Sequence, residues 1–152
     1  MVAKHFPELS VTLTELADRA ASAPSTLCEN DLLPMNVLWD GHDATIIDFG
    51  HADISPYFGD PARFVAFGKP EGGYYVQPTD AREKFLTQYF EIIRSMAGTT
   101  LDRARFDRDI ALGEIAELSL VLAAYIRRTT KFADVASQPE FERVLQLAHT
   151  LG

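Results

Sequence analysis

The feature that most restricts how this chain folds and acts is the spacing of three polar residues in its first third. Asp31 is followed by Asn36 five positions later, and by Asp48 a further twelve positions on, within the stretch DLLPMNVLWDGHDATIIDFG. Neither the roughly 3.6-residue period of a helix nor the two-residue period of a strand produces such intervals. The three side chains are therefore expected on loops, where binding and catalytic residues concentrate.

The segments between these residues predict a β-hairpin. Residues 36–39 and 44–47 are short β-prone runs, and residues 40–43 have the composition of a turn. A hairpin of this kind places Asn36 and Asp48 at adjacent strand ends, although they are twelve positions apart. One unit of loop, strand, turn, strand and loop is thus predicted to carry all three polar side chains.

Helical patterns dominate the rest of the chain. Thr12 and Glu15 form a capping-box pattern that opens a helix, and Asp60-Pro61 is a cap residue followed by proline at the first helical position. The predicted helices cover residues 12–21, 60–67, 79–97, 102–129 and 137–151. Five helices around one hairpin predict a mainly helical α+β fold in a single domain, residues 1–152.

Composition narrows the range of partners. With 47% hydrophobic and 24% charged residues, the 152-residue chain has the usage of an ordinary soluble domain. Its net charge of −8 opposes binding to nucleic acid and to acidic membranes. Cys28 is the only cysteine, so no internal disulfide forms, and no apolar run approaches the ~20 residues of a membrane span. We therefore expect a cytoplasmic protein with no membrane and no nucleic-acid partner.

The pattern D-L-x-x-x-N, followed by a strand pair and D-F-G, is the one with which kinases hold ATP through metal ions. Magnesium binds the crowded phosphate oxygens and needs only a few protein oxygens besides. In this chain Asp48 would bridge the metal ions to the phosphates, and Asn36 would complete the shell of the second metal ion. Asp31 would accept the proton of the attacking hydroxyl. The predicted cofactors are Mg²⁺ and ATP.

Residues 27–66 resemble the catalytic core of the choline/ethanolamine kinase and aminoglycoside phosphotransferase superfamily. LCENDLLPMNVL, from residue 27, is similar to the choline kinase form L-C-H-N-D-L-x-x-x-N-I-L, and IDFG, from residue 47, is closer to the aminoglycoside form. GDPA, from residue 59, resembles the family's helix start N-D-P-A. The resemblance implies the C-terminal lobe of a protein-kinase-like fold, with a catalytic loop at residues 28–38, a metal loop at 46–52 and a helical substrate side at 60–152.

The chain departs from the family pattern at several positions. Glu29 replaces the histidine two residues before the catalytic aspartate, and Phe64 aligns with the aspartate of the D-P-A-x-D-L helix. Both family residues brace the catalytic loop, so the substitutions leave the geometry of that loop open. Leu122 and Tyr125 stand where choline kinases present W-x-x-W to a quaternary ammonium by cation–π attraction, which argues against choline itself.

The resemblance implies a small-molecule hydroxyl acceptor, such as an amino alcohol or an aminoglycoside-like compound. Glu29, His51 and Tyr125 are candidates for contact with that substrate. His51 directly follows the D-F-G of the metal loop and could touch phosphate, but a lone histidine is also commonly structural or solvent-facing.

The sequence before residue 28 contains no glycine-rich loop, no V-A-I-K lysine and no partner glutamate helix. The ATP-binding N-terminal lobe is therefore predicted to be absent, and the chain alone is expected to have negligible kinase activity. Two hypotheses stay open. The chain is either the substrate- and Mg-binding lobe of an ATP-dependent small-molecule phosphotransferase, or a degenerate, non-catalytic relative that acts as a binding or interaction module.

A missing lobe would also uncover apolar side chains of the hairpin and the metal loop. Val37, Trp39, Ile46 and Phe49 would then lie on an exposed face. We expect this face to form a homodimer, or to be covered by a separate polypeptide that supplies the ATP lobe.

Overall fold

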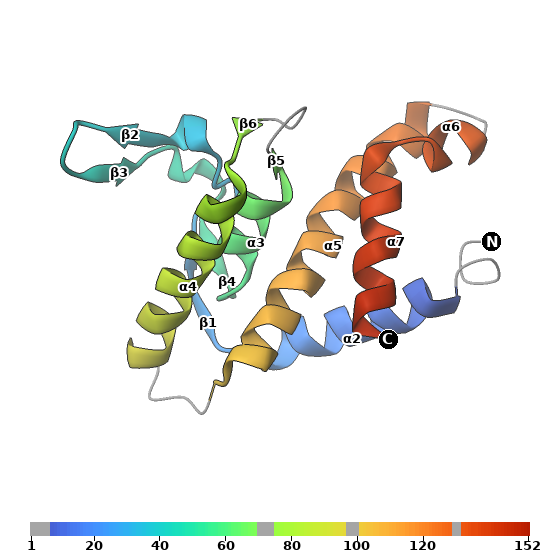
Figure 1. Cartoon of the computed structure of the whole chain (residues 1–152), viewed down its shortest axis with the longest axis horizontal. Helices are drawn as coiled ribbons and strands as arrows, with labels where there is room; N and C mark the ends of the chain where they lie inside the picture. Colours follow the sequence, from blue (N-terminus) through green and yellow to red (C-terminus); the bar gives the residue numbers. More distant parts are fainter. Residues whose placement is uncertain (1–6, 70–74, 97–100, 129–131) are drawn as a thin grey trace.

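The structure, a computed structural model, describes residues 7–69, 75–96, 101–128 and 132–152. Within these ranges the chain forms six α-helices and three two-stranded sheets, two of them antiparallel and one parallel (Figure 1). The helices are α2 (Pro7–Ser22), α3 (Gly59–Ala66), α4 (Thr79–Met96), α5 (Arg103–Arg128), α6 (Phe132–Ala136) and α7 (Pro139–Leu151). The strands are β1 (Ser25–Cys28), β2 (Val37–Trp39), β3 (Ala44–Ile46), β4 (Asp53–Pro56), β5 (Gly68–Lys69) and β6 (Tyr75–Val76). The predicted mainly helical α+β fold is confirmed, with one helix and two strand pairs more than expected.

The predicted hairpin is present. β2 and β3 pair antiparallel, with Val37 opposite Ile46. Asp40 closes the turn between them, because its Oδ1 accepts hydrogen bonds from the backbone N–H groups of His42 (2.8 Å) and Asp43 (2.7 Å). Figure 1 shows the hairpin projecting from the body of the protein.

A second antiparallel pair, β1 with β4, was not expected from the sequence. Leu27 of β1 lies opposite Ile54 of β4, and both side chains are mostly exposed, at 63% and 67%. Because neither strand buries a regular apolar face, their sequences carry no alternating signal. This pair holds the end of β1, where the catalytic loop begins, beside the segment that follows the metal loop.

The predicted starts of two helices are wrong. α2 begins at Pro7, and Thr12 lies inside it with its side chain buried. A Thr-x-x-Glu pattern also occurs within helices, since residues three apart share a face. Asp60 lies in the first turn of α3, and the cap position belongs to Phe58. The Asp60 carboxylate is thus available to another segment of the chain.

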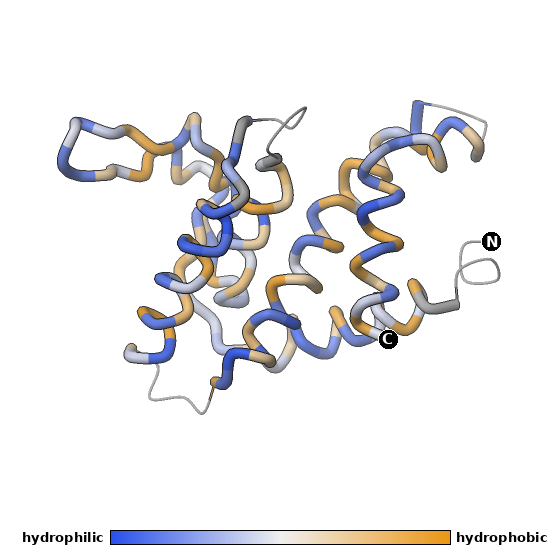
Figure 2. Tube along the Cα trace, viewed as in Figure 1, coloured by the Kyte–Doolittle hydropathy of each residue, from blue (hydrophilic) through white to orange (hydrophobic). Residues whose placement is uncertain are grey.

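The core is built around α5. One apolar cluster joins α5 to α2 and α7 and contains Ile115 and Val144, and a second joins α5 to α3 and α4 and contains Phe106 and Val65. Figure 2 shows hydrophobic and hydrophilic residues alternating along α5 and α7. No helix in the described ranges is long and apolar enough to cross a bilayer.

A close approach at Gly113 sets the distance between α3 and α5. A Cβ atom at this position would lie 2.5 Å from the Cβ atom of Ala62, closer than carbon atoms pack, so only glycine fits. The contact fixes α3, which carries Asp60 and Arg63, against α5, which carries Glu117.

One buried carboxylate joins the N-terminal helix to α5. Asp109, which is 1% exposed, accepts hydrogen bonds from Arg19 Nε (2.8 Å) and Nη2 (2.6 Å) and from the Tyr57 hydroxyl (2.8 Å). The paired, two-bond geometry of the arginine compensates the cost of burying the charge.

Asp109→Ala should lower the free energy of unfolding by about 3 kcal/mol, because it leaves the Arg19 guanidinium and the Tyr57 hydroxyl without their acceptor. Urea denaturation measures the loss. The exposed ion pair between Arg103 and Asp107 gives a control, since Asp107→Ala should cost less than ~0.5 kcal/mol. A loss at Asp109 no larger than at Asp107 would contradict this account.

Three of the four apolar side chains expected on an uncovered face are exposed: Trp39 at 66%, Phe49 at 50% and Ile46 at 43%, whereas Val37 is half-buried. We propose that a second copy of the chain covers this face. Light scattering should then give a dimer mass that Trp39→Ser reduces to a monomer mass. Val11→Ser, at an apolar position of α2 that is 69% exposed, should leave the mass unchanged. A monomer at every concentration would rule the proposal out.

Candidate active site

Two carboxylates hold the catalytic loop in shape through three consecutive backbone amides. Asp60 accepts hydrogen bonds from the N–H of Glu29 through Oδ2 (2.7 Å) and from the N–H of Asn30 through Oδ1 (2.8 Å). The Glu29 side chain in turn accepts the N–H of Asp31 through Oε2 (2.9 Å). Charged acceptors make strong hydrogen bonds to backbone amides, so the backbone just before Asp31 is held by α3.

The substitutions at Glu29 and Phe64 left open whether the catalytic loop is braced, and this arrangement shows that it is. The aspartate that braces the loop is Asp60, one helical turn before Phe64, whose ring packs instead on Tyr75 (5.5 Å between centroids) and Phe85 (4.9 Å). Glu29 also acts as a brace, through its carboxylate. The catalytic loop is therefore braced by Asp60 and by Glu29, which occupies the position of the family's histidine.

Asn36 connects the catalytic loop to the metal loop. Its side-chain Nδ2 donates to the carbonyl oxygen of Asp31 (3.0 Å), and its own carbonyl accepts the N–H of Ile47 (2.9 Å). The carbonyl oxygen Oδ1 is the atom of an asparagine side chain that can ligate a metal ion, and the bond from Nδ2 sets the orientation of the amide. Asp48 directly follows Ile47, so the two predicted metal ligands lie at neighbouring points, as the hairpin predicted.

The metal loop itself is a tight turn. Asp48 has a left-handed backbone (φ 63°) and precedes the single 3₁₀ turn Phe49–His51. Aspartate tolerates this conformation better than most residues do. The side chains of Asp48 and His51 are both exposed, and His51 takes part through its carbonyl oxygen, which accepts a hydrogen bond from Asn30 Nδ2 (3.0 Å).

The electrostatics of Glu29 indicate that four carboxylates share this region. Burial raises the pKa of Glu29, the N–H of Asp31 opposes the rise, and the negative charges of Asp31, Asp60 and Asp48 add to it. Glu29 is only 2% exposed, and its Oε1 is buried without a hydrogen-bond partner. The charges of Asp31, Asp48 and Asp60 therefore all lie near enough to Glu29 to affect it.

Arg63 and Glu117 are site residues that the sequence analysis missed. Arg63 of α3 donates from Nη2 to Asp31 Oδ1 and from Nη1 to Glu117 Oε2 (2.5 Å). Burial raises the pKa of Glu117, and the charge of Arg63 opposes the rise. Arg63 lies 32 positions from Asp31 and 54 positions from Glu117 in the sequence. No local sequence pattern therefore indicates these contacts.

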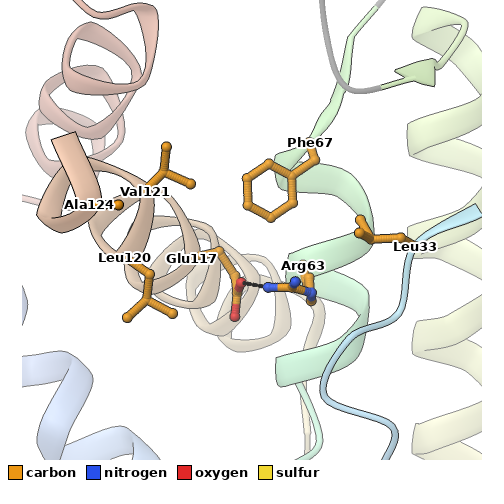
Figure 3. A pocket seen from close by; sticks show the side chains of 7 residues that line it. All are labelled: Leu33, Arg63, Phe67, Glu117, Leu120, Val121 and Ala124. Atoms are coloured by element: carbon orange, nitrogen blue, oxygen red, sulfur yellow. Dashed lines mark hydrogen bonds and ion pairs between the residues drawn. The ribbon is translucent and has the colours of Figure 1, made fainter. Parts of the chain in front are cut away.

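A pocket of about 300 Å³ lies beside this ion pair, between α3 and α5 (Figure 3). Its other lining residues are apolar: Leu33, Phe67, Leu120, Val121 and Ala124. Tyr125, a predicted substrate residue, lines a neighbouring pocket of about 230 Å³ that shares Val121 and Ala124. Leu122, its expected companion, is buried in the core.

Cys28, the residue that opens the catalytic loop, takes no part in the chemistry. It is 1% exposed, and burial raises the pKa of its thiol to about 11. The thiolate that a nucleophile or metal ligand needs is therefore scarce at neutral pH.

Magnesium is the metal ion that the sequence pattern predicts for this site. The described part of the chain holds no cluster of three or more His, Cys, Asp or Glu side chains arranged to hold a metal ion. Magnesium bound to a nucleotide needs no such cage, because phosphate and water supply most of its ligands. Asn36 Oδ1 and the Asp48 carboxylate are the protein groups that would hold it.

A braced catalytic loop, a hairpin and a metal loop after it define a chain of the protein-kinase-like class. The phosphotransferase enzyme family, APH, matches residues 2–98, and the chain belongs to this family. No curated protein and no solved structure matches the chain.

Glu29→Gln should raise the melting temperature at pH 8 and leave it nearly unchanged near pH 4.5. The raised pKa means that the native state favours protonated Glu29, so stability falls as the pH rises from the ordinary value of 4.5 through the raised one. Glutamine is uncharged and still accepts the N–H of Asp31. Thermal unfolding at the two pH values measures the difference.

Glu83→Gln is the matched control with the opposite sign. Arg103 donates a hydrogen bond to Glu83 and lowers its pKa, so this contribution is present above pH 4.5 and is lost in acid. The variant should be slightly less stable than the wild type at pH 8. A Glu29→Gln variant that melts lower at pH 8 would contradict the assignment.

Proposed function

We propose that the chain is the metal- and acceptor-binding part of an ATP-dependent phosphotransferase that acts on the hydroxyl group of a small amino alcohol or an aminoglycoside-like molecule. The observation that carries the proposal is the double hydrogen bonding of Asn36, to the carbonyl of Asp31 and to the N–H that precedes Asp48. These bonds support the proposal because they link the backbone of Asp31, the proposed base, to Asn36 and to the residue before Asp48, the proposed metal ligands. Membership of the phosphotransferase family supports the assignment.

Each residue has a distinct task in this proposal. Magnesium-bound ATP supplies the phosphoryl group when it is present. Asp48 and Asn36 Oδ1 would hold the metal ion, which would in turn position the phosphates. Asp31 accepts the proton of the acceptor hydroxyl as its oxygen bonds to the γ-phosphorus and the bond to the ADP oxygen breaks. Arg63 holds Asp31 Oδ1, which leaves Oδ2 to take the proton.

The pocket beside Asp31 supports an acceptor with an amino group. Its two charged residues, Glu117 and Arg63, form an ion pair, and Arg63 also pairs with Asp31. Two carboxylates around one guanidinium leave a net negative charge, which favours a cationic group on the ligand. The apolar remainder of the lining suits the carbon skeleton next to it.

The Arg63–Asp31 ion pair also favours a second candidate, a non-catalytic relative that binds ligands or partners. The guanidinium of Arg63 occupies Oδ1, one of the two oxygens through which Asp31 could meet an acceptor hydroxyl. In that case the same acidic site would bind a metal-bound nucleotide without transferring its phosphoryl group.

Calorimetric titration with ATP in the presence and absence of Mg²⁺ tests the proposed site. We expect heat of binding only with Mg²⁺, and we expect Asp48→Ala to abolish it by removing the carboxylate ligand. Asp43→Ala, at the exposed tip of the hairpin, removes the same charge and should bind as the wild type does. A flat wild-type titration, or equal losses in the two variants, would refute the site.

A further inference from the structure

Asn30 forms a second link between the two loops of the site, in addition to the one that Asn36 makes. It precedes Asp31 in the catalytic loop, and its side-chain Nδ2 donates to the carbonyl oxygen of His51 at 3.0 Å. His51 ends the short turn that follows Asp48. The amide of Asn30 therefore spans from the residue next to the base to the end of the metal loop.

This link closes a ring of hydrogen bonds with the one that Asn36 makes. From Asp31 the ring passes through its carbonyl to Asn36 Nδ2, and from the Asn36 carbonyl to the N–H of Ile47. It continues along the metal loop to the His51 carbonyl and returns through Asn30. Asp31 and Asp48 lie on opposite arms of this ring, so its closure limits how far they can separate.

The backbone of Asn30 explains why asparagine stands at this position. Its φ is 64°, in the left-handed region that asparagine tolerates better than most residues. Its N–H is held by Asp60 Oδ1 (2.8 Å), which fixes the backbone from which the side chain extends. Glycine would accept the same φ, but it has no amide to donate.

We propose that Asn30 is a positioning residue that sets the spacing between the base Asp31 and the metal ligand Asp48. The inference deepens the proposed function and rests on it, since the spacing matters only if both residues act on one metal-bound nucleotide. The bond lies at the partly exposed rim of the site and joins two short loops. Its main effect is therefore on the geometry of the loops, with little effect on the stability of the core.

Asn30→Gly separates this role from a merely conformational one. If the residue served only to adopt a positive φ, glycine would be silent and Asn30→Ala would be damaging. A positioning role predicts that both variants lose the link. Asn30→Asp keeps the shape and the tolerance of positive φ, but it turns an acceptor toward the His51 carbonyl and should be at least as damaging as glycine.

The first measurement needs no ligand. Amide hydrogen exchange in Asn30→Gly should become faster at Ala52, whose N–H bonds to the Phe49 carbonyl in the metal loop (3.1 Å). Exchange at Ile47, on the other arm of the ring, should change less. Unchanged exchange at Ala52 would overturn the proposal whether or not the protein binds nucleotide.

The second measurement is the affinity for Mn²⁺-bound ATP by calorimetry. Residues that orient metal ligands typically change metal affinity by about 10-fold or more, so we expect Asn30→Gly to weaken binding about 10-fold while the melting temperature stays close to that of the wild type. Equal affinity in wild type and Asn30→Gly would overturn the proposal. A wild type that binds no nucleotide would refute the proposed function and with it the role of Asn30 in metal binding. Faster exchange at Ala52 would then show a tether between the loops and nothing more.

Discussion

The hold of Asp60 on the catalytic loop is the constraint on which the site depends. One carboxylate accepts two successive backbone amides, those of Glu29 and Asn30, and so fixes the direction in which the chain enters Asp31. Asp60 lies on α3, and α3 is set against α5 by the close contact at Gly113. The path from the packed core to the proposed base is therefore short, because α3 holds the backbone before Asp31 through Asp60 and the Asp31 side chain through Arg63.

The concentration of negative charge at the site follows from the same arrangement. The negative charges of Asp31, Asp48 and Asp60 all add to the rise in the pKa of Glu29, and Glu29 has a buried oxygen with no hydrogen-bond partner. Clustered carboxylates cost folding free energy unless a cation or protons neutralise them. Arg63 neutralises part of this negative charge through its ion pair with Asp31. A divalent cation would neutralise the remaining negative charge. This is the electrostatic argument for the proposed phosphotransferase site.

Sequence patterns anticipated the parts of the structure that local periodicity encodes. α4 and α5 lie almost where their apolar spacing placed them, and the hairpin was found from two β-prone runs and a turn. The β1–β4 pair was missed because its facing residues, Leu27 and Ile54, are exposed and the strands are separated by the whole catalytic unit. The early start of α2 was missed because the Thr12 pattern suits a helix interior as well as a cap.

The sequence predicted that Asn36 and the metal loop lie side by side, but it did not predict the contacts that support the catalytic loop. Asn36 lies beside the metal loop that Asp48 begins, as their spacing around the hairpin predicted. The roles of Asp60, Arg63 and Glu117 arise from contacts across 30 or more positions, which a single sequence does not reveal. The GDPA match pointed to the segment that holds Asp60, but the side chain was assigned to capping its own helix.

Paramagnetic broadening by Mn²⁺ tests most directly whether Asp31, Asn36 and Asp48, which are separated in the sequence, lie around one metal ion. With ATP present, substoichiometric Mn²⁺ should broaden the amide NMR signals of Asp31, Asn36 and Asp48 before those of the acidic surface residues of α4, because broadening falls steeply with distance from the ion. Broadening that spares any of the three, or that follows surface charge alone, would contradict the claim that they face a common cleft.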